Sequence, residues 1–302
     1  MAVSDGKSNH RTRIDIPFDF LRHCTITFDQ MKKWTFFNDD YIEAENALLH
    51  FKDLSFQRGY GLFDFFRLVG DQPLFLDDHL DRFYASAEAM HLKIDFSRAE
   101  IKTVIQNLIL RNNLPGTGVR LNLTGGYSAD GFTIASPNLT ISQTTFSSPS
   151  KDHMENGISL LSYPHVRQLP HIKTTDYIMA VWLQPLLKQK GVDDVLFHQN
   201  GILSECSRNN FLLVTMDDRI ITPHQNILPG ITRKKLLEVA AKEFEVEERT
   251  VTLQDIREAK EAFITGTIKQ ILPVARVDDV VFNDHKISNQ LRHCFQSAYI
   301  NS

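Results

Sequence analysis

The sequence is short of the features that mark several large classes of protein. Its 302 residues include three cysteines, Cys24, Cys206 and Cys294, and no two of them have CxxC spacing. This argues against a disulfide framework or a cysteine zinc site and predicts a protein of the reducing cytoplasm. No apolar run approaches the roughly 20 residues that a membrane-spanning helix needs. The N-terminus also lacks the basic-then-apolar profile of a secretory signal.

Charge and histidine content exclude further classes. A formal net charge of −4 gives no general attraction to nucleic acid or to an anionic membrane. The 12 histidines have no spacing typical of metal ligands, so we predict no metal site. With 42% hydrophobic and 23% charged residues the composition is globular, and the length suits one large domain or two of ordinary size.

Strand and helix patterns alternate along most of the chain. Residues 1–30 are polar at first and have no clear period, so we treat them as an N-terminal extension. The polar stretch "SSPSKDHMEN" (147–156) is typical of a linker. We therefore predict an α/β (α+β) protein with a small domain at 31–146 and a larger one at 157–302.

Two helices are predicted in the first domain from apolar spacing. One carries Leu80, Phe83, Tyr84 and Ala87 on one face; the other opens at Ser97 with a capping box and carries Ile101, Val104, Ile105 and Leu108. Strands are predicted as a pair from residue 31 and at 63–69, 73–76, 119–124, 139–146, 158–163, 194–198, 210–214, 262–265 and 273–281. Further helices are predicted at 176–190, from about 232, and at 286–299.

One lysine stands at the head of an apolar run in "LPHIKTTDYIMAVWL" (169–183). Ile172 precedes Lys173, and Tyr177, Ile178, Met179 and Trp182 follow. Burial lowers the pKa of a lysine, and a neutral amine can form a Schiff base with a carbonyl such as the aldehyde of pyridoxal phosphate. The alternative is a lysine at the end of a strand that reaches solvent.

A phosphate-bearing cofactor would need donors elsewhere in the chain. In "ILPGITRKKLLEVAA", Gly230 permits a close turn, and Ile231 and Thr232 begin a helix whose free N–H groups favour a dianion. "FITGTIKQILPV" places Gly266 and Thr267 at a second corner. Both stretches are also compatible with simple turns, the first with a threonine helix cap.

A pyridine ring also needs a partner for its nitrogen. Glu205 in "GILSECSRNNFLLV" lies between a turn and an apolar strand, where a carboxylate requires a donor. Its simplest other explanation is an acid at a hairpin end that pairs with Arg208. Arg82 in "HLDRF" lies off the apolar face of its helix and could contact a phosphate or remain in solvent.

Taken together, six stretches resemble the class IV (fold type IV) pyridoxal-phosphate aminotransferase family, which includes D-amino-acid aminotransferase, branched-chain aminotransferase and aminodeoxychorismate lyase. They occur in family order: "FQRGYGLFDFFRL", "HLDRFYASAEAM", "HIKTTDYIMAVWL", "GILSECSRNNFLL", "LPGITRKKLLEVA" and "ITGTIKQILPV". The resemblance covers roughly residues 34–300. It implies that the cofactor is pyridoxal 5′-phosphate and that it lies between a small and a larger domain of a homodimer.

The resemblance also assigns roles to residues. It implies that Lys173 is the Schiff-base lysine and the general acid and base, and that Glu205 is the partner of the pyridine nitrogen. It places five residues at the phosphate: Arg82, Ile231, Thr232, Gly266 and Thr267. Ping-pong transamination between an amino acid and a 2-oxo acid is the implied reaction.

The substrate is less well defined, because the chain departs from the familiar subgroups. It reads "TGGYSADGF" where D-amino-acid enzymes have an Arg-x-His carboxylate trap, and "RGYGLFDFF" where branched-chain enzymes have "YG…FEG". We predict Arg58 and Arg120 as a carboxylate clamp, with Arg58 reaching across a dimer; structural ion pairs are the alternative. Three phenylalanines could form an apolar side-chain pocket: Phe63, Phe65 and Phe66, of which alternation directs Phe66 away.

We favour a transaminase of D-amino acids. An L-branched-chain aminotransferase, aminodeoxychorismate lyase and a catalytically silent protein that binds pyridoxal phosphate are the alternatives.

Overall fold

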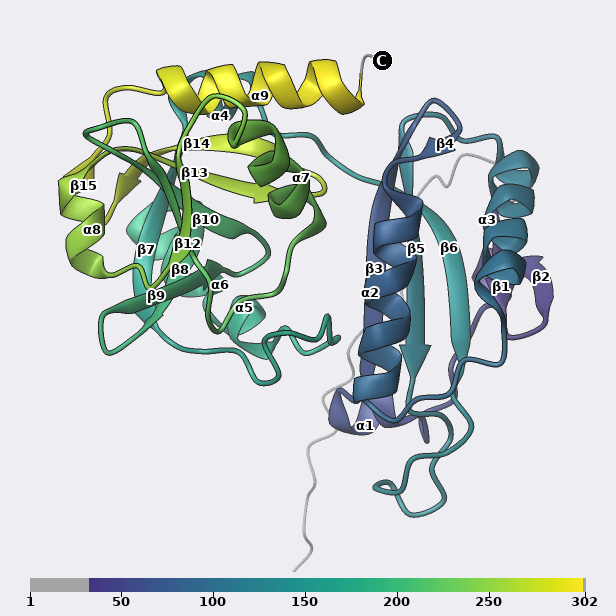
Figure 1. Ribbon diagram of the computed structural model, residues 1–302. Helices are drawn as coiled ribbons and strands as arrows, with labels where there is room; N and C mark the ends of the chain where they lie inside the picture. The colour runs from purple at the N-terminus through teal and green to yellow at the C-terminus, as the bar shows by residue number, and fades with distance from the viewer. Residues whose placement is uncertain (1–32, 301–302) are drawn as a thin grey trace, which may run out of the picture. The chain divides into compact units, whose positions relative to one another are not determined.

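The computed structural model describes residues 33–300, and the predicted N-terminal extension lies outside them. The described residues form a mixed α/β fold, as predicted, with two sheets (Figure 1). No helix among residues 33–300 is long and apolar enough to cross a membrane.

The first sheet has six strands in the order β2-β1-β6-β5-β3-β4. All of its strand pairs are antiparallel. Its strands are β1 (Trp34–Phe37), β2 (Asp40–Glu43), β3 (Gly61–Val69), β4 (Gln72–Pro73), β5 (Thr117–Thr124) and β6 (Leu139–Thr145). The short helices η2 (Ala44–Asn46) and α1 (Leu54–Arg58) connect β2 to β3.

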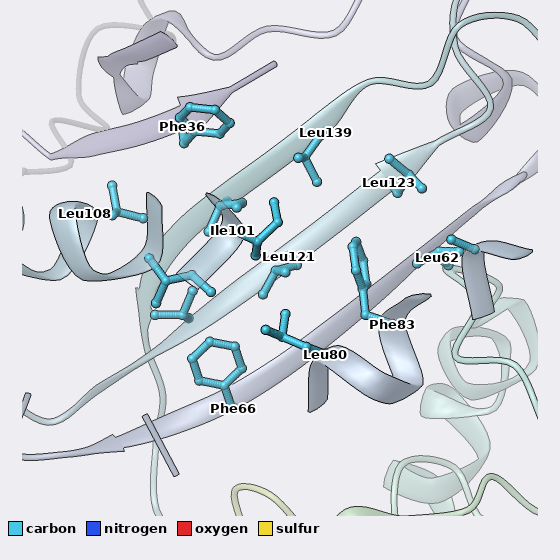
Figure 2. Close-up of a cluster of buried hydrophobic side chains, with 14 of the residues drawn as sticks. Phe36, Leu62, Phe66, Leu80, Phe83, Ile101, Leu108, Leu121, Leu123 and Leu139 are labelled. Atoms are coloured by element: carbon cyan, nitrogen blue, oxygen red, sulfur yellow. The ribbon is translucent and has the colours of Figure 1, made fainter. Parts of the chain in front are cut away.

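Helices α2 (Leu76–Ala89) and α3 (Arg98–Asn112) lie alongside this sheet (Figure 1). Their predicted apolar faces are confirmed, because both helices contribute to one buried cluster with β3, β5 and β6. Figure 2 shows Leu80 and Phe83 of α2 together with Ile101 and Leu108 of α3 in that cluster. The predicted capping box is also present: Ser97 accepts from the Glu100 N–H, and the Glu100 carboxylate accepts from the Ser97 N–H.

Alternation along β3 separates a core face from an outer face. Phe66 is fully buried in the core cluster (Figure 2), as predicted. Phe63 is on the opposite face. On the neighbouring strand, Arg120 lies directly opposite Phe65 and stacks on the ring of Phe63. The outer face therefore presents aromatic rings and a guanidinium.

The second sheet has nine strands, with β7, β8 and β14 paired in parallel. Its strands are β7 (Ile158–Pro164), β8 (Asp194–Gln199), β9 (Ile202–Cys206), β10 (Asn210–Thr215), β11 (Ile220–Pro223), β12 (Val246–Arg249), β13 (Ala259–Gly266), β14 (Gln270–Val277) and β15 (Val280–Val281). Helices α7 (Ile231–Ala240) and α9 (Lys286–Tyr299) pack on it through one apolar cluster, and α8 (Leu253–Glu258) contributes to another.

Four predicted elements differ in the structure. The predicted strand at 273–281 is two antiparallel strands, β14 and β15. Leu76 begins α2 and does not end a strand, so β4 is only two residues long. The predicted helix at 176–190 is two helices, α5 (Ile178–Trp182) and α6 (Gln184–Lys190), because Pro185 lacks the N–H that a continuous helix would use. The predicted linker contains a short helix, α4 (Lys151–Asn156). The predicted domain boundaries stay a prediction.

Candidate active site

One pocket brings together all seven residues that were predicted at the cofactor. Its lining includes Arg82, Lys173, Glu205, Ile231, Thr232, Gly266 and Thr267. The other lining residues are Arg167, Tyr177, Ser207, Arg208, Asn209, Asn210, Leu228, Gly230, Arg233 and Thr265. They come from α2, from the segment before α5, from β9 and β10, from the start of α7, and from the β13–β14 corner. Five lining side chains are cationic and one is a carboxylate, so the pocket favours an anion.

The backbone around Lys173 is fixed to strand β3 of the first sheet. The Phe63 N–H donates to the Lys173 carbonyl over 2.9 Å, and the Thr175 N–H donates to the Gly61 carbonyl over 2.9 Å. These bonds place the Lys173 ammonium 4.6 Å from the centre of the Phe63 ring. The lysine therefore projects from a rigid support.

Burial lowers the pKa of Lys173 to about 7, and the nearby Arg82 charge adds to the effect. Within residues 33–300, no carboxylate forms a hydrogen bond or ion pair with its amine. The source of the burial differs from the prediction, because Ile178 and Trp182 are 73% and 64% exposed. One residue that shields the Lys173 amine from water is Phe63, whose ring it contacts.

We expect Lys173→Met to stabilise the cofactor-free protein at low pH. The folded-state pKa of about 7 lies below the ordinary value of 10.5, so the unfolded chain binds this proton more tightly. Below pH 7 the buried lysine therefore lowers the free energy of unfolding by its full amount. This destabilisation declines between about pH 7 and 10.5, by at most about 1.4 kcal/mol per pH unit. Denaturant unfolding of both proteins across this range measures the difference. A difference independent of pH would contradict the lowered pKa.

Glu205, on β9, is 5% exposed and accepts three hydrogen bonds. The donors are Arg167 Nε at 2.9 Å, the Leu228 N–H at 3.0 Å and Asn210 Nδ2 at 3.2 Å. Burial raises the pKa of Glu205 above its ordinary value, although the Arg167 charge opposes this. The sequence-based alternative, a pair with Arg208, is wrong.

Arg167 was missed by the sequence analysis. Its Nη2 also donates to the Pro170 carbonyl over 2.7 Å, which fixes the guanidinium beside Glu205. Arg167 and Glu205 are 38 residues apart, and no local pattern links them. The arginine holds the carboxylate in place while leaving it on the pocket wall.

Arg82 is oriented by a buried carboxylate that the sequence analysis also missed. Asp64 on β3 is 1% exposed and binds Arg82 in a bidentate manner, with both N···O distances at 2.9 Å. His79 Nδ1 lies 2.7 Å from the same carboxylate. Burial alone would raise the pKa of Asp64, but Arg82 and His79 lower it below its ordinary value. Burial lowers the pKa of His79, so at neutral pH it is an uncharged donor to Asp64.

We expect Asp64→Asn to weaken cofactor binding about tenfold while destabilising the protein by about 2–4 kcal/mol. Asparagine cannot form the bidentate pair that holds the Arg82 guanidinium toward the pocket. Equilibrium titration with pyridoxal 5′-phosphate and denaturant unfolding measure the two effects. Asp81→Asn is the matched control, since Asp81 is exposed on α2 and pairs with Arg98. Equal cofactor affinities of the Asp64 and Asp81 variants would exclude this role.

The start of α7 is open toward the pocket. Gly230 is the N-cap and has no side chain to cap the helix, so the first N–H groups of Ile231 and Thr232 are free for an anion. A Cβ on Gly230 would clash with Asn210 Oδ1, so a larger residue here would displace the Asn210 side chain. Within the described chain, the buried Thr265 hydroxyl has no hydrogen-bond partner.

These residues fit pyridoxal 5′-phosphate. A helix N-terminus and Arg82 suit its phosphate, an amine with a pKa of about 7 suits its aldehyde, and the Glu205 carboxylate suits a protonated ring nitrogen. No group of three or more His, Cys, Asp or Glu side chains in the described residues could hold a metal ion.

The two arginines predicted as a carboxylate clamp do not line this pocket. Arg120 stacks 4.1 Å from the Phe63 ring centre, on the face of the sheet opposite the first core. It is half-buried, and burial lowers its pKa. Arg58 ends α1, is exposed, and donates to the Gln57 carbonyl.

The fold matches that of solved structures. The fold is similar to the solved branched-chain amino acid aminotransferase of Escherichia coli, with a TM-score of 0.82 and 20% identity over 89% of this chain and 95% of that one. This confirms the predicted fold type IV architecture.

The family follows from the sequence. The family model for amino-transferase class IV matches residues 61–277, and the chain therefore belongs to this family of pyridoxal-phosphate-dependent enzymes. It is 29% identical to D-alanine aminotransferase of Listeria monocytogenes, over 85% of this chain and 93% of the relative. It is also 29% identical to a putative branched-chain-amino-acid aminotransferase of Methanocaldococcus jannaschii, over 83% of this chain and 90% of the relative.

Proposed function

We propose that the protein uses pyridoxal 5′-phosphate to move an amino group between an amino acid and a 2-oxo acid. The main support is Lys173, whose pKa of about 7 leaves a large neutral fraction of the amine near neutral pH. A neutral amine can both react with a carbonyl and accept a proton. Both halves of a ping-pong transamination require these properties.

The mechanism divides the work among the pocket residues. When bound, the cofactor supplies an aldehyde and a ring that accepts the electron pair released at the substrate Cα. Lys173 Nζ takes the proton from the substrate Cα and later returns a proton. Glu205, held by Arg167, keeps a proton on the ring nitrogen. The phosphate would be held by Arg82, the N–H groups of Ile231 and Thr232, and the Gly266–Thr267 corner.

We favour D-amino acids as substrates, which the identity to D-alanine aminotransferase supports. L-branched-chain transamination is the second candidate, supported by an equal identity to the Methanocaldococcus jannaschii relative. Lyase activity and a silent cofactor-binding protein are further alternatives. The predicted carboxylate clamp of Arg58 and Arg120 stays a prediction; Arg120 lies over the Phe63 ring.

We also propose a homodimer in the cytoplasm. Several large apolar side chains are exposed between residues 48 and 56 and near 132, including Leu48, Phe51, Phe56 and Phe132, which suits burial by a second copy. The Arg58 guanidinium is in the same region and would reach the partner's pocket. The free thiols of Cys206 and Cys294 suit a reducing compartment. Sedimentation of the purified protein tests the assembly.

An absorbance spectrum tests the function directly. A protein with bound cofactor should absorb at about 410–420 nm, and this band should move to about 330 nm when D-alanine or D-glutamate is added. The same change with L-leucine but with no D-amino acid would favour the branched-chain class. A band that no amino donor changes would favour the silent protein. No band after addition of pyridoxal 5′-phosphate would refute the proposal.

A further inference from the structure

The arginines that line the pocket differ in how they are held. Arg208 has no hydrogen bond, ion pair or ring contact with any other residue in the 33–300 range. The other three are paired with carboxylates inside the protein: Arg82 with Asp64, Arg167 with Glu205, and Arg233 with Glu248. One guanidinium of the pocket is therefore available to an anion from solution.

Arg208 lines the same pocket as Lys173. It lies in the turn between β9 and β10. Its carbonyl oxygen is 3.5 Å from the position that a Cβ would occupy if Gly266 had a side chain. Its charge also acts on the Tyr177 phenol. Burial raises the pKa of Tyr177, and the positive charge of Arg208, among other cations, opposes that rise. The Tyr177 ring is 5.8 Å from the Phe63 ring, on which the Lys173 ammonium lies. Arg208, Tyr177 and Lys173 all line this pocket.

The other cationic features of the pocket are already used. The start of α7 and Arg82 suit the phosphate, and Arg167 neutralises Glu205. A substrate amino acid or 2-oxo acid brings its own carboxylate, which needs a cation near the reacting carbon. A guanidinium is suited to this because it can donate two parallel hydrogen bonds to a carboxylate.

We propose that Arg208 binds the carboxylate of the amino acid and 2-oxo acid substrates. This inference rests on the proposed function and identifies its substrate-binding residue. Arg208 is the only one of the three candidate cations, Arg58, Arg120 and Arg208, that lines the described pocket. It can therefore act within a single subunit.

The test compares Arg208→Gln and Arg208→Lys with the wild type. Arg257→Gln is the matched control, because it also removes one exposed arginine, paired with Asp279, outside the pocket. Three quantities are measured: the Kd of pyridoxal 5′-phosphate, the Kd of an unreactive carboxylate such as propionate for the holoenzyme, and the KM for D-alanine and L-leucine. The propionate Kd needs no turnover.

We expect Arg208→Gln to raise the propionate Kd and the amino-acid KM at least about tenfold, which is the loss of one charge-assisted contact. The cofactor Kd should stay within about twofold of the wild-type value. The propionate Kd and amino-acid KM of Arg208→Lys should lie between those of the wild type and those of Arg208→Gln. A primary amine without a carboxylate should bind to the holoenzyme equally well with and without Arg208. Arg257→Gln should match the wild type throughout.

Two results would overturn the assignment. A raised cofactor Kd with an unchanged propionate Kd would place Arg208 at the phosphate. Unchanged values for both ligands would show that Arg208 contacts neither the cofactor nor the substrate carboxylate. A wild type that binds propionate through Arg208 but transaminates nothing would refute the proposed function and leave this contact standing.

Discussion

Lys173→Ala is expected to lower the transamination kcat by at least about a hundredfold, the usual contribution of a positioned general base. The alanine variant loses the amine that takes the Cα proton and the group that holds the cofactor covalently. The protein should still fold, because removing a buried amine with a pKa of about 7 relieves a desolvation cost. Stopped-flow absorbance with a saturating amino donor measures the rate.

Lys188→Ala is the matched control, since Lys188 is an exposed lysine on α6. It should leave kcat unchanged. The Lys173 variant should also lack the band at about 410–420 nm while still binding pyridoxal 5′-phosphate. A variant that retained more than about a tenth of the wild-type rate would remove Lys173 from the mechanism.

Glu205 is expected to matter for both stability and rate. Glu205→Ala leaves the Arg167 guanidinium buried without a counter-charge and removes the acceptor of the Leu228 N–H and of one Asn210 hydrogen bond, which should cost about 3–5 kcal/mol of unfolding free energy. Glu205→Gln preserves the shape and one acceptor oxygen, so it should cost less. It should still lower kcat by about a hundredfold or more, because an amide cannot keep the ring nitrogen protonated.

Denaturant unfolding and steady-state kinetics separate the two effects. The double variant Arg167→Gln, Glu205→Gln has no unpaired charge and should recover stability relative to Glu205→Ala without recovering rate. Glu258→Gln is an exposed control on α8. Full activity of Glu205→Gln would show that the carboxylate has a structural role only.

Local rules predicted the local structure of this protein. The capping box of Ser97 and Glu100, and the apolar stripes of α2 and α3, are set by residues three and four apart, so they can be read directly. The split at Pro185 was missed because an apolar period was extended through a residue without an N–H.

Long-range pairs were much harder to predict. Arg167 meets Glu205 only because the segment before Lys173 lies beside β9 in the folded chain. A signal for Asp64 was available, however. Alternation puts it on the core face of β3 with Phe66, and a carboxylate there needs a buried partner. His79 precedes Phe83 by one helical turn, so its burial could also have been predicted.

The bonds between β3 and the Lys173 segment bear on how hybrid enzymes of this family can be made. Lys173 and Thr175 come after the predicted linker in the chain, yet their backbones are bonded to Phe63 and Gly61, before it. A chimera with a crossover at 147–156 would thus combine the lysine of one parent with the supporting strand of the other. A crossover after residue 177 keeps both from one parent, and chimeras of this kind should retain the parental titration of the lysine.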